Sequence, residues 1–126
     1  MLFAGSVNST GVTNWYFEIT SANKLRFEWD NTSTFFEAIS TASISQNAWT
    51  YVAVVRNGGT ITQYINGSAD GTASPTGTYK NASYPLSIGR AGDYNGLYFT
   101  GYIDEFRMAY VARTITASPT GPFPLG

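Results

Sequence analysis

The sequence predicts an all-β protein built as two antiparallel sheets packed face to face. Three observations predict it. Apolar and polar residues alternate in several short segments, Asn-Gly and other turn residues separate them, and no amphipathic helix of useful length occurs. With 126 residues, 43% hydrophobic and 12% charged, the chain has ample apolar material for one core. Its surface must consist mostly of Ser, Thr, Asn, Gly and Tyr.

The first predicted strands form an antiparallel hairpin. Residues 14–20 and 24–29 each alternate apolar with polar side chains, as a strand with one buried face does. The three residues between them favour a turn. Residues 34–40 are expected to follow as a third strand.

Residues 49–66 predict a second hairpin. Asn57-Gly58-Gly59 joins its two strands, and Asn66-Gly67 ends the second strand with another tight turn, because Asn-Gly adopts positive φ at low cost. Apolar residues occupy every position from 51 to 55, so neither face of the first strand is fully polar. This pattern favours a central strand covered on both sides.

The next part of the chain is less regular. Residues 71–83 are rich in Gly, Pro, Thr, Ser and Asn and read as a long loop with at most a short strand, and residues 86–90 read as a short strand. Residues 97–110 are the longest apolar-rich run and predict a strand. Its inward parity changes between Ile103 and Phe106, which indicates either a β-bulge near Asp104, the option we prefer, or two covered faces.

The C-terminal residues predict no further strand. Residues 112–118 could form one short helical turn. The proline-rich segment 119–126 is expected to leave the domain as an extended tail, because proline offers no ladder donor. We therefore expect one sandwich domain over residues 1–118 and a tail over residues 119–126.

Composition excludes several classes of function. The net charge of −1 comes from scattered residues, so no basic cluster exists for nucleic acid, and no apolar run is long enough for membrane insertion. The absence of His and Cys excludes His-based triads, thiol nucleophiles and His/Cys metal sites. Four Asn-x-Ser/Thr triplets occur, at Asn8, Asn31, Asn66 and Asn81, and we attribute them to chance in an Asn-, Ser- and Thr-rich chain.

Several motifs occur along the chain in one order. They are Lys24-Leu25-Arg26-Phe27, Trp49-x-x-Val52-Ala53-Val54-Val55-Arg56, Tyr64-Ile65-Asn66-Gly67, Ile88-Gly89 and Phe99-x-Gly101-x-Ile103-Asp104-Glu105-x-Arg107. Together they resemble the laminin G-like, concanavalin A-like jelly-roll domains. The resemblance implies a jelly-roll-like sandwich and a binding or structural module, not an enzyme.

The end of the chain narrows the resemblance. Val111-Ala112-Arg113-Thr114 followed by Pro119-Thr120-x-Pro122-Phe123-Pro124 is similar to an ending found in such domains of phage and marine-virus structural proteins. Domains of this family usually open with two further strands, which this sequence lacks. We expect those strands to come from an upstream segment, the simpler option, or from a neighbouring chain by strand donation.

Two kinds of acidic site can be considered. The glucanase pattern of three acids on one strand is half matched by Glu28 and Asp30, and the better interpretation is a solvated outer residue and a turn former. Calcium is common in laminin G-like relatives, and Asp70 and Asp93 are the candidate ligands. Both are more simply read as turn residues. The chain is expected to require no cofactor, with calcium as an option.

Exposed tyrosines beside polar loops would suit glycan binding, because rings stack on sugars while amides bind hydroxyls. The candidate ligand-binding residues are Tyr79, Tyr84, Asp93, Tyr94, Asn95, Tyr98 and Tyr102. The residues expected to matter for the fold are Trp49, Asn66, Gly67, Gly89, Gly101 and Asp104. For Asp104 we expect a carboxylate that accepts bonds from loop N–H groups or from an arginine.

The function predicted from these features is that of a non-enzymatic structural or adhesion module. The resemblance of the tail implies a phage-type virion component, such as capsid decoration or a tail fibre, that contacts other virion proteins, copies of itself or host glycans. The alternative is a secreted carbohydrate-binding module, with or without calcium. The predicted location is the virion, or the extracellular space for the alternative.

Overall fold

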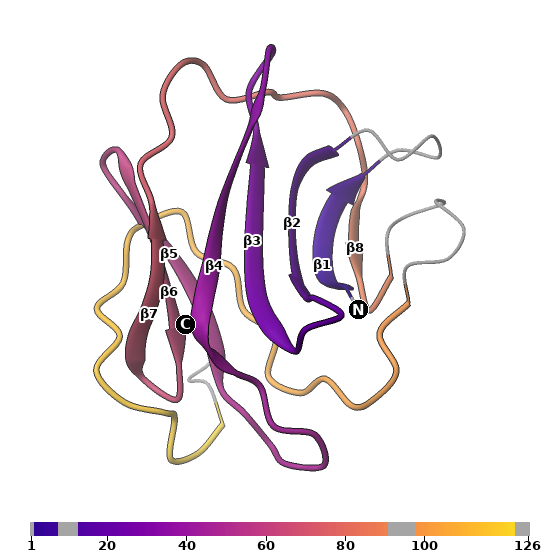
Figure 1. Cartoon of the computed structure of the whole chain (residues 1–126), viewed down its shortest axis with the longest axis vertical. Helices are drawn as coiled ribbons and strands as arrows, with labels where there is room; N and C mark the ends of the chain where they lie inside the picture. Colours follow the sequence, from indigo (N-terminus) through magenta and orange to yellow (C-terminus); the bar gives the residue numbers. More distant parts are fainter. Residues whose placement is uncertain (1, 8–12, 91–97, 123–126) are drawn as a thin grey trace.

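The computed structural model describes residues 2–7, 13–90 and 98–122 (Figure 1). These residues form eight strands and no helix, so the all-β prediction is confirmed and no described helix could cross a membrane. The strands are β1 (Leu2–Val7), β2 (Thr13–Ile19), β3 (Lys24–Asp30), β4 (Phe35–Ser43), β5 (Val52–Asn57), β6 (Thr60–Ile65), β7 (Ser68–Ala73) and β8 (Leu86–Ile88).

The strands form two antiparallel sheets. One has five strands in the order β4-β3-β2-β1-β8, and the other has three in the order β5-β6-β7. In the five-stranded sheet Phe17 pairs with Phe27 and Ile19 with Leu25, so the alternation of both strands places apolar side chains on the same inner face.

The turns of the three-stranded sheet follow from their glycines. Gly58 has a φ of 57° between β5 and β6, and Asn66 and Gly67 have φ values of 50° and 85° between β6 and β7. Ile65 pairs with Ser68 across this second turn, which makes it a two-residue hairpin loop with both central residues in the left-handed region. Both predicted Asn-Gly turns are therefore confirmed.

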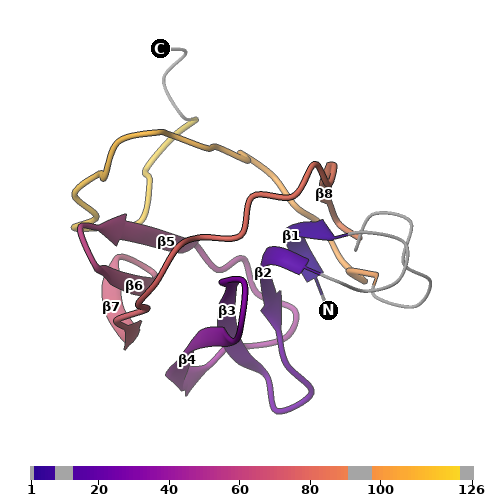
Figure 2. The same ribbon diagram turned by 90° about the horizontal axis from the view of Figure 1, so that it is seen from above.

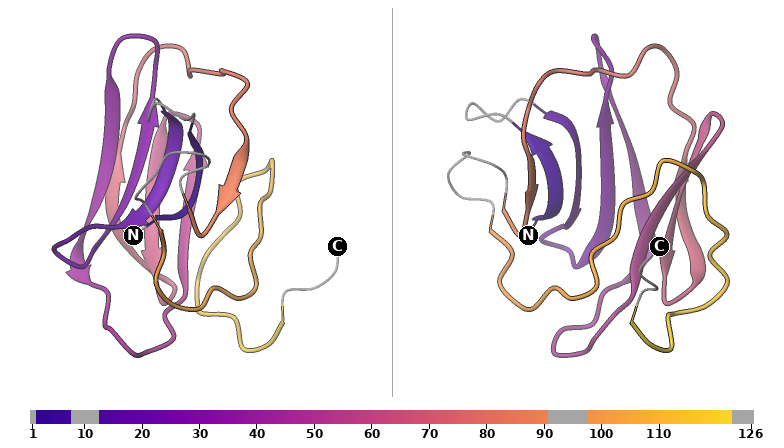
Figure 3. Two further views of the ribbon diagram at one scale, coloured as in Figure 1. Left: turned by 90° about the vertical axis from the view of Figure 1, so that its right-hand side faces the viewer. Right: turned by 180° about the vertical axis from the view of Figure 1, so that it is seen from behind.

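The two sheets meet along one border and diverge toward the other. Seen from above, β4 lies beside β7, while β5 and β8 lie at the separated ends (Figure 2). We call the β4–β7 border the closed side and the space between β5 and β8 the open side. Residues 98–122, the C-terminal segment, run across the open side without forming a strand (Figure 3).

The core lies between the sheets and has two clusters. The first joins Phe17, Ile19, Leu25 and Ile44, with Val52 and Val54 packed against it from the other sheet. The second joins Trp29, Ala38 and Ile61 nearer the closed side. Leu25 is fully buried, whereas Val52 and Val54 of β5 are only half-buried.

Four sequence-based expectations are wrong in detail. Residues 68–73 form strand β7, although 71–83 were expected to be mostly loop. The described residues 98–110 contain no strand, only an isolated bridge at Tyr98, and residues 112–118 form no helical turn. Strand β5 is an edge strand and not a central one among the described strands. The physical reason for both errors at 98–110 and β5 is the same: neither has a ladder partner on the open side.

Candidate functional site

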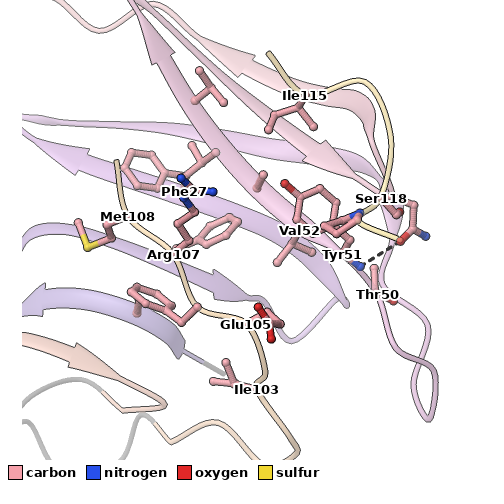
Figure 4. A pocket seen from close by; sticks show the side chains of 18 of the residues that line it. Phe27, Thr50, Tyr51, Val52, Ile103, Glu105, Arg107, Met108, Ile115 and Ser118 are labelled. Carbon is pink, nitrogen blue, oxygen red and sulfur yellow. Dashed lines mark hydrogen bonds between the residues drawn. The ribbon is translucent and has the colours of Figure 1, made fainter. Parts of the chain in front are cut away.

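The open side holds a cleft of about 1980 Å³ between the two sheets. Phe17 and Phe27 line it from the five-stranded sheet, and Val52 and Val54 line it from β5. Residues 98–122 form its cover, and Figure 4 shows the stretch with Ile103, Arg107 and Met108 passing over the strands. The cleft is therefore an apolar interior that the described strands do not fill.

The C-terminal segment is attached at its two ends. At one end the Phe99 N–H donates to the Gly89 carbonyl at 2.8 Å, and the Phe99 ring packs against the first core cluster. At the other end the backbone of Ala117 lies against Gly67, where a Cβ would come within 2.4 Å of it. Gly67 is thus required twice, by its positive φ and by this close approach. Between these ends nearly all side chains are exposed.

Large apolar side chains stand exposed around the mouth of the cleft. We call them the apolar rim: Trp49, Tyr102, Met108, Tyr110 and Val111, all of which line the cleft. Trp49 is 73% exposed and Tyr102 is 87% exposed. Apolar groups gathered over an apolar cleft are typical of a surface that another molecule covers.

The candidate tyrosines do not form one cluster. Tyr79 and Tyr102 line the cleft, whereas Tyr84 and Tyr98 do not. Tyr79 packs on Trp29 with ring centroids 5.4 Å apart, and burial raises its pKa. Tyr98 is more than half exposed and forms a bridge with Arg90. Asp93, Tyr94 and Asn95 lie outside the described residues.

Asp70, a candidate metal ligand, is held by backbone donors of the other sheet. Its carboxylate accepts hydrogen bonds from the N–H groups of Thr41, at 2.6 Å, and Ala42, at 2.7 Å. Slight burial would raise its pKa, but these donors hold the pKa of Asp70 below its ordinary value. Among the described residues no group of three or more acidic side chains is placed to hold a metal. The carboxylate joins β7 to β4 on the closed side.

The residues expected to support the fold take different positions. The Asn66 side chain accepts a hydrogen bond from the Tyr51 N–H at 3.0 Å, which fixes the turn against the start of β5. Trp49 belongs to the exposed rim and not to the core. Gly89 and Gly101 both have positive φ. Asp104 is exposed, and its carboxylate accepts a bond from the N–H of Glu105, without the predicted strand around it.

A charged network on the outer face of the five-stranded sheet was not predicted as a site. Arg26 donates to Glu18 at 2.8 Å and to the Tyr16 hydroxyl at 2.8 Å, and that hydroxyl donates to Glu28 at 2.6 Å. Glu37 joins from β4, with Arg26 at 3.4 Å. The parity of the β2–β3 hairpin could have indicated this cluster, because Tyr16, Glu18, Arg26 and Glu28 all point outward.

This network corrects one expectation and limits the chemistry of its acids. Glu28 was interpreted as a solvated residue, yet it is buried, and burial raises its pKa while Tyr16 and Arg26 oppose the rise. Asp30, at the end of β3, accepts a bond from the Thr13 hydroxyl at 2.8 Å. Burial and the bond to Glu28 hold the pKa of Tyr16 above its ordinary value. The carboxylates of Glu18 and Glu28 therefore each have a protein partner.

Two buried polar groups lack a hydrogen-bond partner among the described residues. They are both ends of the Gln63 amide and the indole N–H of Trp29. Gln63 is fully buried on the inner face of β6, and Arg56 stacks over the Trp29 ring at 4.4 Å. Unpaired buried groups of this kind cost stability.

The comparisons with known proteins agree with this architecture. A laminin G family model, described as the concanavalin A-like lectin/glucanases superfamily, matches residues 1–116. No curated protein matches the chain. Among solved structures, an S-layer domain-containing protein from Clostridium thermocellum (residues 221–444) is similar, with 24% identity and a TM-score of 0.48. The match covers 86% of this chain and 56% of that one. On the family match and the two-sheet antiparallel fold, the chain belongs to the laminin G-like, concanavalin A-like superfamily.

Proposed function

We propose that this domain is a non-catalytic structural and adhesion module that is present in many copies on a larger assembly. The similarity of its tail to phage structural proteins makes a phage-type virion the assembly that we favour. The single observation that carries the proposal is the apolar rim around the open side. Such a surface is stable in water only when another protein surface or ligand covers it for part of the time.

The absence of catalytic equipment among the described residues supports a binding role. Laminin G-like domains are generally binding folds of lectin type. The chain contains no His or Cys, and the clustered acids Glu18 and Glu28 are bonded to Arg26 and Tyr16. A carboxylate tied in this way is a poor nucleophile, because its partners stabilise the ionised state that a reaction must consume.

The proposal is tested by measuring self-association through the rim. Sedimentation equilibrium of the wild-type chain should show oligomers whose population rises with concentration, and the double variant Tyr102→Ser/Tyr110→Ser should remain monomeric. Phe35→Ser is the matched control, since Phe35 is also an exposed aromatic residue but does not line the cleft. A wild-type chain that stays monomeric and also fails to bind purified virion proteins would contradict the proposal.

The second candidate function is carbohydrate binding, and the exposed rings favour it. Trp49 and Tyr102 could stack on sugar faces, as aromatic residues of glycan sites do. A glycan array probed with the wild-type chain would then give binding that Tyr102→Ala reduces. The same array repeated with a calcium chelator tests the calcium option. Binding of this kind by a monomer would place the domain in the extracellular carbohydrate-binding class.

A further inference from the structure

The open side carries a more specific feature than an apolar surface. Strand β5 pairs with β6 along one edge, in an unbroken register from Val52 to Asn57, and no described strand pairs with its other edge. Residues 50–56 all line the cleft, including neighbours that point to opposite faces of the sheet. Only the edge of a strand can present both faces to one space. The cleft therefore lies beside the free edge of β5.

This edge lacks the devices that normally protect an edge strand. Natural edges are short, bulged, charged or interrupted by proline. β5 has no bulge, no proline and no charge before Arg56, and its residues 52–55 are apolar on both faces. By contrast, β8, the other strand at the open side, has only three residues. A regular, apolar, uncharged edge is the pattern of a strand that has neighbours on both sides.

We propose that the free edge of β5 receives an extended strand from a neighbouring protein chain, which enters the cleft beneath residues 98–108. This inference rests on the proposed function and names the class of partner that the open side takes. The donated strand would form ladder hydrogen bonds with β5. Its alternate side chains would face Phe17 and Phe27, which line the opposite wall.

An extended strand fits the cleft better than a folded surface does. The C-terminal segment spans the mouth and is anchored at Phe99 and near Ala117, so the entrance is covered by the chain itself. The β5 edge of a second folded copy would have to displace that segment first. A single strand needs only the space between the segment and the sheet.

The inference is tested with defined peptides and hydrogen exchange. The probe is a fluorescent decapeptide with Val, Ile or Phe at every second position and Ser or Thr between them. The control peptide has the same composition with its apolar residues at helical spacing. The alternating peptide should bind the full chain, and it should slow exchange at β5 amides by at least about tenfold. The control peptide should do neither.

A matched pair of variants localises the binding. Val54→Lys places a charge under the incoming strand, because Val54 packs toward both core clusters, and should weaken peptide binding at least about tenfold, roughly 1.4 kcal/mol. Thr62→Lys changes β6, which is already paired on both sides, and should leave binding unchanged. Circular dichroism checks that each variant is folded, and exchange in the wild-type chain decides the matter if Val54→Lys is not.

Other results would overturn the inference. Equal binding of both peptides, or protection that appears away from β5, would show that the cleft does not take a strand. Protection of β5 in the peptide-free chain that rises with self-association would assign the edge to a second copy. If self-association through the rim persists while no peptide binds, strand addition is wrong and the proposed assembly function stands.

Discussion

The two borders of this sandwich are built in different ways. On the closed side Asp70 of β7 accepts two backbone hydrogen bonds from Thr41 and Ala42 of β4, and Gly71 lets the two chains approach closely. On the open side β5 and β8 are separated, and an irregular segment with exposed aromatic rings spans the gap. The difference teaches that apolar area alone does not join two sheets. A border closes where particular polar and glycine residues allow backbones to meet.

The largest effect is expected from a methyl group on the closed side. In Gly71→Ala the new Cβ would lie 2.7 Å from the carbonyl oxygen of Ile39, at a φ of 91° that disfavours side chains. We expect a loss of about 3 kcal/mol in the free energy of unfolding, measured by urea denaturation.

The control is Gly59→Ala, which has open space around its Cβ position and no positive φ. It should change stability by less than about 0.5 kcal/mol. Equal stability of the two variants would mean that the backbones do not approach closely at this border.

Asp70→Asn should have the next largest effect. The amide retains one oxygen for two N–H donors, so one backbone bond is lost, and we expect a loss of about 1–2 kcal/mol at neutral pH. The pKa of Asp70 is lowered from 3.8, so its contribution is full above that value and is lost as pH falls through the folded-state pKa.

Unfolding of wild type and variant at several pH values checks the sign of this effect. The stability difference should be constant from neutral pH down to about 4 and should shrink below it. A difference that grows in acid would show that Asp70 is not held in its ionised form.

These predictions concern residues that sequence patterns reach only in part. Alternation and Asn-Gly turns are sufficient to predict β2, β3, β5 and β6, because each has an apolar face and a defined turn. The strand β7 is missed since its residues, Ser-Ala-Asp-Gly-Thr-Ala, carry little hydrophobic pattern, and it exists through its pairing with β6. The run 97–110 has a strand pattern without a strand among its described residues, because alternation supplies a face but not a ladder partner.

The candidate site shows the same limit. The tyrosine-rich surface was predicted in kind, yet Trp49 was assigned to the fold and stands exposed on the rim. The network around Arg26 depends on the register of three neighbouring strands, which pairs Glu18 with Arg26 and Glu28 with Glu37. Composition cannot give that register, although hairpin parity indicates that these residues share a face.

Gln63→Met sharpens the comparison from the apolar side. Gln63 is fully buried and neither end of its amide has a described partner. An apolar side chain of similar length removes the unpaired groups, so we expect the free energy of unfolding to rise by about 1 kcal/mol. Thermal or urea unfolding measures it, and a decrease would show that the amide has a bonding partner.

The smallest effect on stability is expected at the rim. Tyr102→Ser/Tyr110→Ser removes exposed rings that contribute little to the core, so the free energy of unfolding should change by less than about 0.5 kcal/mol. Self-association should nevertheless be lost. A large loss of stability in the monomer would instead make the rim part of the core.

Native-state hydrogen exchange tests the contrast between the two borders most directly. We expect β4 and β7 amides to exchange only through global unfolding. The β5 amides that do not pair with β6, together with residues 98–110, should exchange through local opening at a much lower free energy. Equal protection of both edges of β5 in the isolated monomer would contradict the account, because it would mean that the open side is already closed.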